Sequence, residues 1–188
     1  MITGLGDSMH LLRIATPADI PELGPLIEQS VRALSVGYYT GPQVESALQH
    51  VFGPDTQLIA DLTYYVVEGE AGALIAAGGW SRRRTLYGGD QMKGETDPLL
   101  DPTTEAARLR AYFVHPAWAR RGLGRRLFDR CAADAARAGF RALELVATLP
   151  GEPLYLALGF VPLERTVVAL PDGQELPVIR MARPLPES

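Results

Sequence analysis

The spacing of apolar residues changes several times along the chain, and each change predicts a different element. A short apolar run at residues 11–15 predicts a strand. Thr16 and Pro17 then supply a helix N-cap and a proline at the first helical position, and apolar residues follow at helical spacing up to Leu34. Thr40-Gly41-Pro42 predicts the start of a second helix, and Gly53-Pro54 its end.

The middle of the chain has the pattern of strands joined by turns. Residues 62–68 and 73–80 are rich in apolar and β-branched or aromatic residues and flank a glycine-containing turn, which predicts a hairpin. Residues 106–114 predict a further strand. Residues 85–104 have glycines, prolines and acidic residues but no period, so we expect a loop there. Because such long loops are unusual in a compact domain, this one is a candidate substrate lid.

The last third returns to alternating helices and strands. We expect a helix at 121–138 that ends at Gly139, a strand at 142–148 and a short helix at 153–158. A final hairpin joins 165–170 to 176–181. The strand–helix–strand crossover between 112 and 146 implies one parallel pair in a mainly antiparallel sheet. The fold class is thus α/β (α+β), with about seven strands and about four helices. It forms one domain over 11–186, preceded by a loosely ordered lead-in at 1–10.

Composition removes several classes of function. Of the 188 residues, 47% are hydrophobic and 21% charged, as in a soluble globule, and no apolar run approaches the ~20 residues that a membrane helix needs. The first ten residues lack the features of a secretory signal. One cysteine, Cys131, and three scattered histidines give no pattern of metal ligands. We therefore expect a cytoplasmic protein with no metal and no membrane contact.

The charges are unevenly placed. Lys and Arg total 18 against 22 Asp and Glu, a net charge of −4 that argues against nucleic-acid binding. Nine arginines nevertheless fall between Arg108 and Arg141. By charge alone this segment is equally compatible with a solvated helix face and with a local anion site.

The segment after Val114 favours the anion site. Pro116 ends the strand, and Gly122 and Gly124 open the following helix. The first turn of a helix has N–H groups without partners, and these attract an anion together with the helix dipole. Glycines let a bulky anion approach the backbone. A tight turn with solvated arginines is the alternative. The segment lacks the Lys-Ser/Thr of a P-loop and the third glycine of a dinucleotide fingerprint.

Over residues 11–183 the order of elements and this segment resemble the GNAT N-acetyltransferase superfamily. The family pattern Gln/Arg-x-x-Gly-x-Gly/Ala matches at both glycines, but Ala119 stands where Gln or Arg is usual. The resemblance implies acetyl-CoA as co-substrate, its pyrophosphate on the helix amides and its pantetheine arm paired with the preceding strand. The cofactor-binding residues it implies are Phe113, Val114, Arg120, Arg121, Gly122, Leu123, Gly124, Arg125 and Arg126.

A second match concerns catalysis. Tyr155-Leu156-Ala157-Leu158-Gly159-Phe160 is similar to the family's Tyr-x-x-x-Gly-Phe segment, which implies that Tyr155 is the general acid for the leaving thiolate. A packing role is the alternative. The resemblance also implies that the N–H of Val114 polarises the thioester carbonyl. The general base stays open: Arg108 stands where relatives can carry a glutamate, while Glu105, Glu144 and His115 are available.

The acceptor is less defined. The resemblance implies a primary amine of a small molecule or peptide, and nominates Tyr38, Tyr39 and Trp80 as substrate-binding residues, with packing as the alternative for Tyr38 and Tyr39. The Arg82-Arg83-Arg84 run is either a contact for an acidic acceptor or solvent-facing. A non-catalytic acyl-CoA sensor and a different nucleotide-phosphate binder remain alternative functions. The sequence does not decide between a monomer and a homodimer.

Overall fold

The computed structural model describes residues 10–94 and 96–186, so that most of the predicted lead-in, residues 1–9, lies outside the described part. The helices are α1 (Ile20–Leu34), α2 (Gly41–His50), α3 (Thr56–Ala60), α4 (Leu123–Arg137) and α5 (Glu152–Ala157). The strands are β1 (Leu11–Ile14), β2 (Tyr64–Glu68), β3 (Leu74–Ser81), β4 (Ala107–Val114), β5 (Ala142–Thr148), β6 (Val161–Ala169) and β7 (Glu175–Pro184). The described residues contain no helix that is both long and apolar enough to span a bilayer.

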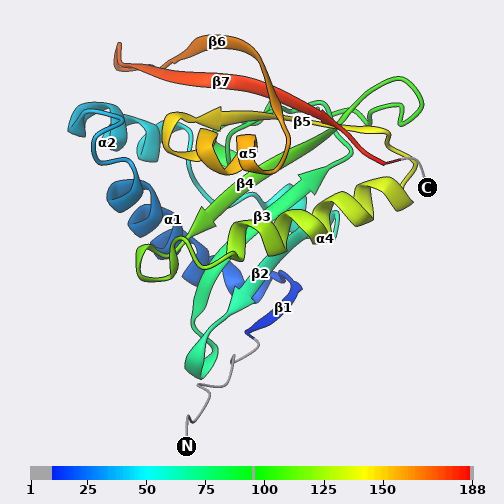
Figure 1. The fold of residues 1–188 in the computed structure, drawn as a ribbon. Helices are drawn as coiled ribbons and strands as arrows, with labels where there is room; N and C mark the ends of the chain where they lie inside the picture. The colour runs from blue at the N-terminus through cyan, green and yellow to red at the C-terminus, as the bar shows by residue number, and fades with distance from the viewer. Residues whose placement is uncertain (1–9, 95, 187–188) are drawn as a thin grey trace, which may run out of the picture.

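All seven strands belong to one sheet with the order β1-β2-β3-β4-β5-β7-β6 (Figure 1). Neighbouring strands are antiparallel except β4 and β5, which are parallel because α4 carries the chain back between them. The predicted mixed, mainly antiparallel fold is therefore confirmed.

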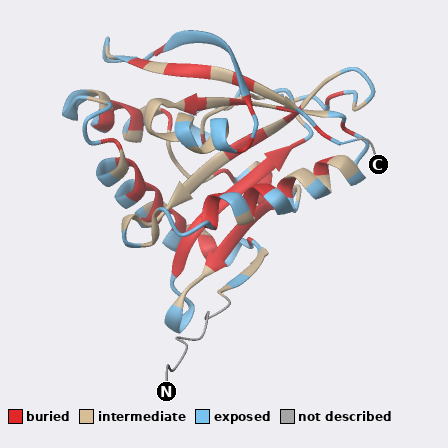
Figure 2. Ribbon diagram, in the orientation of Figure 1, coloured by how far each residue is buried: buried red, intermediate tan, exposed pale blue. Residues whose placement is uncertain are grey.

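Helices cover both faces of the sheet. The amphipathic α4 lies on one face, where Leu127 and Cys131 belong to the same buried cluster as apolar residues of β3, β4 and β5. On the other face, α1 packs Leu23 and other apolar residues against β2 and β3. Figure 2 shows the resulting burial, which is most complete along β2 and β3 and decreases toward β6. The domain thus has two layers of helices with the sheet between them.

Several predicted boundaries are wrong. The described residues form five α-helices where the sequence predicts about four; the additional one, α3, is a single turn capped by Asp55, whose side chain accepts from the N–H of Leu58. The first helix begins with a separate 3-10 turn, Pro17–Asp19. β6 and β7 are longer than the predicted hairpin. The pattern missed the first residues of β6 because this edge strand is almost fully exposed and has no alternation of polar and apolar residues.

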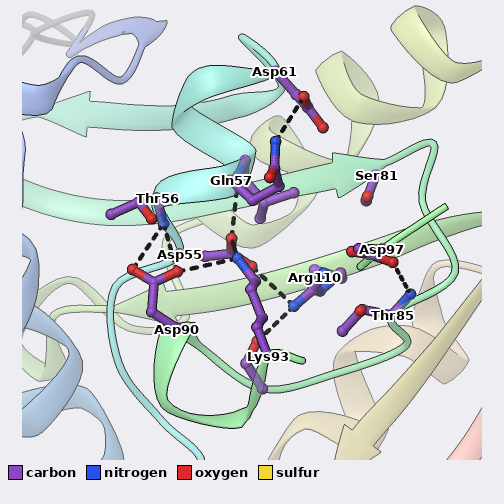
Figure 3. Close-up of polar contacts among 12 residues, drawn as sticks. Asp55, Thr56, Gln57, Asp61, Ser81, Thr85, Asp90, Lys93, Asp97 and Arg110 are labelled. Atoms are coloured by element: carbon purple, nitrogen blue, oxygen red, sulfur yellow. Dashed lines mark hydrogen bonds and ion pairs between the residues drawn. The ribbon is translucent and has the colours of Figure 1, made fainter. Parts of the chain in front are cut away.

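The long segment between β3 and β4 is held by ion pairs instead of standing free as a lid. Lys93 reaches the buried carboxylate of Asp55, and Asp90 accepts from the backbone N–H of Thr56 at 3.0 Å (Figure 3). Asp55 in turn pairs with Arg110 of β4 at 2.9 Å, and both side chains have almost no exposed surface. Because opening the segment would separate buried charges, it forms a fixed wall beside β4.

Candidate active site

The sheet divides between β4 and β5. These strands pair only at Ala107 with Leu143 and at Arg108 with Glu144, and they separate beyond that point. The separation coincides with a bulge in β4, where the register against β3 shifts and Ala111 has a φ of 56°. A bulge bends its strand and ends regular pairing. The end of β4 therefore presents an edge toward β5 that β5 does not fill.

Val114 lies on this edge. The next residue, His115, donates its N–H to Ile75 of β3 at 2.8 Å, so the N–H of Val114 faces the opposite side. There it donates to the hydroxyl of Ser30 in α1 at 3.2 Å. Ser30 was not identified from the sequence, although a serine between Ile27 and Val31 interrupts the buried face of α1.

The start of α4 has the unpaired amides that the sequence predicts. Gly122 is the N-cap residue and has no side chain to cap the helix, and the first hydrogen bond of the helix runs from Arg126 N–H to the Gly122 carbonyl at 3.0 Å. Within residues 10–94 and 96–186, no acceptor contacts the N–H groups of Leu123, Gly124 or Arg125. Three adjacent donors at the positive end of a fifteen-residue helix fit a pyrophosphate.

The two glycines of this turn have different environments. Gly122 has a φ of 82°, and a Cβ there would meet no atom within 4 Å, so the backbone is open to a ligand. A Cβ on Gly124 would lie 2.8 Å from Cδ2 of Leu154 in α5. The need for glycine at 122 is therefore conformational, whereas Gly124 lets α4 pack closely against α5.

Four arginines lie next to the amides in the sequence. The Arg121 guanidinium lies over the Trp118 ring, 4.8 Å from its centroid, and Arg125 donates to the Ala157 carbonyl at 3.3 Å. In the described part of the chain, no carboxylate lies within 4.0 Å of the Arg120, Arg121, Arg125 or Arg126 side chains. Their charge is thus available to an anion.

Tyr155 lies on α5, on the face of the sheet that α4 covers. Its ring packs edge-to-face with Tyr112 of β4 and with Phe160, with centroids 6.3 Å and 5.8 Å away. Its hydroxyl has no hydrogen-bond partner among the described residues, and burial raises the pKa of Tyr155 well above its usual value. The phenol therefore keeps its proton at neutral pH and is able to donate it.

The three aromatic residues predicted to bind the acceptor do not form one site. Trp80 is 2% exposed and packs edge-to-face with Phe140 in the core beneath α4. This burial corrects the prediction that Trp80 binds the acceptor. Tyr39 packs between α2 and β7 with its hydroxyl bonded to backbone groups. Tyr38 is 49% exposed and is the one of the three with a free surface.

The neighbouring charged residues are mostly engaged. Arg83 pairs with Asp61 at 2.7 Å, Arg84 lies 3.6 Å from Glu105, and Arg82 stacks on Trp80. Glu144 lies between Arg108 at 2.8 Å and Arg180 at 2.9 Å, and Nδ1 of His115 accepts from the N–H of Ala117 at 3.2 Å. None of the candidate bases is thus free of a structural partner.

The comparisons with known proteins agree with this geometry. A family model for the acetyltransferase (GNAT) domain matches residues 60–162, more than half of the chain. No curated protein sequence matches significantly. The chain belongs to the GNAT acetyltransferase family. As a member of this family it is an acyltransferase with acetyl-CoA as its co-substrate.

Solved structures show the same fold. A GCN5-related N-acetyltransferase from Rhodopseudomonas palustris is 18% identical with a TM-score of 0.69, over 95% of this chain and 97% of that one. A phosphinothricin acetyltransferase from Sinorhizobium meliloti, in complex with AcCoA, is 22% identical with a TM-score of 0.61, over 94% and 88%. The PaiA N-acetyltransferase from Thermoplasma acidophilum, in complex with coenzyme A, is 11% identical with a TM-score of 0.60, over 93% and 98%.

Proposed function

We propose that the protein transfers the acetyl group of acetyl-CoA to a primary amine of a small molecule or peptide. The observation that carries this proposal is the set of unpaired amides at Leu123, Gly124 and Arg125, next to the unfilled edge of β4. A helix N-terminus suits a pyrophosphate, and a free strand edge suits an extended amide chain such as a pantetheine arm.

The side chains around these groups have complementary tasks. The thioester supplies an acyl group that a neutral amine can attack. The arginines at 120, 121, 125 and 126 attract the phosphates of the co-substrate. The N–H of Val114 exchanges the Ser30 hydroxyl for a ligand oxygen. The hydroxyl of Tyr155 gives its proton to the departing sulfur, and a basic group or a water removes a proton from the amine.

Binding of the co-substrate is tested first. Coenzyme A should raise the melting temperature of the protein, whereas ATP and NAD at the same concentration should raise it much less. The affinity for coenzyme A should also fall as salt is added, because charges bind the phosphates. Equal stabilisation by all three ligands would favour a general nucleotide-phosphate binder.

Turnover is tested second. Release of thiol from acetyl-CoA should depend on an amine drawn from a panel of amino acids, polyamines, aminoglycosides and peptides with free N-termini. The rate should follow the neutral fraction of the amine. Tight binding of coenzyme A without turnover on any amine would contradict the proposed acetyl transfer to an amine and favour an acyl-CoA sensor.

A further inference from the structure

The bulge of β4 is built by residues from the neighbouring strands. Tyr64 of β2 pairs with Gly79 of β3, and Gly79 pairs with Arg110 of β4, so these three residues form one row across the sheet. A Cβ on Gly79 would lie 2.8 Å from Cδ2 of Tyr64. The Tyr64 ring therefore lies over the bare backbone of β3.

The position of this ring brings its hydroxyl to the bulge. Tyr64 is fully buried, and its hydroxyl donates to the carbonyl of Ala111 at 3.1 Å. Ala111 is the residue with a φ of 56°, a conformation that is costly for a residue with a Cβ. The hydrogen bond is thus made to the strained residue itself, from two strands away.

The residues on either side of Ala111 are also fixed. On the α4 side, a Cβ on Gly78 would lie 2.9 Å from the Tyr112 ring, so this glycine makes room for the ring. On the other side, Arg110 is held by Asp55 at 2.9 Å and by the Gly88 carbonyl at 2.5 Å (Figure 3). The bulge is consequently held on both faces of the sheet, and Tyr64 is its direct contact at the centre.

We propose that Tyr64 is a positioning residue for acetyl-CoA. Through the Ala111 carbonyl it holds β4 in the bent course that separates it from β5 and leaves Tyr112, Phe113 and Val114 on an open edge. This inference rests on the proposed function, because that edge is where we place the pantetheine arm. Tyr64 itself does not lie on the edge and acts only through the backbone of β4.

Tyr65 provides a matched control on the same strand. It is 2% exposed, and its hydroxyl donates to Asp134 of α4, on the opposite face of the sheet. Tyr64→Phe and Tyr65→Phe each remove one hydroxyl from a buried ring and keep the ring. Both variants should lose some stability, but only the first loses a bond to the bulge.

The experiment measures the Kd of coenzyme A by calorimetry, the KM for acetyl-CoA and the melting temperature of both variants. Tyr64→Phe should raise the Kd and the KM by about tenfold, as expected for loss of one well-placed hydrogen bond, while Tyr65→Phe stays within about twofold of the wild type. A purely structural role would lower the two melting temperatures and leave both values of Kd unchanged, and this result would overturn the inference.

Gly78→Ala should disturb the bulge from the α4 face of the sheet, because the new Cβ would displace the Tyr112 ring. It should weaken coenzyme A binding in the same direction, and it provides the test if Tyr64→Phe does not yield folded protein. Wild-type affinity in the folded Gly78→Ala variant would also overturn the inference. A wild-type protein that binds no coenzyme A would refute the proposed function, which is a different outcome.

Discussion

The hydroxyl of Tyr39 accepts a hydrogen bond from the backbone N–H of Leu149 at 2.9 Å. The same hydroxyl donates to the carbonyl of Pro177 in β7 at 2.6 Å. One side chain thus connects the α1–α2 turn to β7 and to the segment that leads into α5 and Tyr155. Burial raises the pKa of Tyr39 to about 12, so the phenol stays protonated and both hydrogen bonds persist at neutral and mildly alkaline pH.

Replacement of Tyr39 tests this connection. Tyr39→Phe should lower the free energy of unfolding by about 1–3 kcal/mol, because it leaves the N–H of Leu149 without its acceptor. Tyr38→Phe is the control, since the exposed Tyr38 should change stability by less than about 0.5 kcal/mol. Urea unfolding measures both, and equal stability of the two variants would contradict the structural role of Tyr39.

The close approach of α4 and α5 at Gly124 and Leu154 predicts that a larger residue at position 124 would displace α5. Gly124→Ala places a Cβ against Leu154 and should displace α5, so that kcat falls more than the affinity for coenzyme A. The double variant Gly124→Ala, Leu154→Ala should recover much of the lost kcat, because the smaller side chain makes room. Failure of this rescue would show that the added methyl group acts on the ligand and not on the helix packing.

The role of Tyr155 predicts a selective loss of turnover. Tyr155→Phe should lower kcat by about 100-fold with little change in the Kd of coenzyme A, because it removes the proton donor and keeps the ring. Since burial raises the pKa of Tyr155, ionisation of this group should not reduce wild-type kcat as the pH rises to 10. Wild-type kcat in the phenylalanine variant across the pH range would remove Tyr155 from the mechanism.

The pair of Asp55 and Arg110 predicts a large loss of stability. Asp55→Asn leaves the charge of Arg110 buried without its carboxylate and should cost about 3–5 kcal/mol. Glu45→Gln breaks an exposed pair with Arg32 and should leave stability close to that of the wild type. Chemical denaturation compares the two variants, and similar small losses would show that the ion pair does not hold the wall beside β4.

The pair of Arg13 and Asp19 predicts a dependence of stability on pH. The Arg13 guanidinium, 2.6 Å away, lowers the pKa of Asp19 to about 2, and the carboxylate is largely buried. A lowered pKa stabilises the folded state above the unfolded pKa, and this stabilisation is lost as the pH falls toward 2. Asp19→Asn should therefore cost about 2 kcal/mol at pH 7, and the difference from the wild type should shrink between pH 4 and pH 2. A constant difference would contradict this linkage.

Local signals in the sequence predict the elements well. Thr40 and Pro42 start α2 where the sequence indicates, Gly139 follows the end of α4, and the Arg130–Asp134 pair forms at 2.6 Å. These features depend on residues within one or two turns of one another, which is the range over which capping and spacing act. The family-specific glycines likewise lie within one short turn.

Contacts between distant residues could not be predicted in this way. Tyr64 and Ala111 are 47 positions apart, and Ser30 and Val114 are 84 apart. A tyrosine in a strand has the same local pattern whether its hydroxyl meets solvent, a side chain or a strained carbonyl. The burial of Trp80 could not be predicted for a similar reason. Its position in the alternation of β3 does not tell which face of the sheet α4 covers.

With only two residue pairs between β4 and β5, the backbone ladders of the sheet fall into two groups. Strands β1 to β4 and strands β5 to β7 each have extensive ladders of their own, whereas little backbone pairing crosses from one group to the other. The core does not follow this division, because a single apolar cluster takes residues from β2, β3, β4, β5 and β7. The gap between β4 and β5 therefore interrupts the backbone pairing of the sheet without interrupting its core.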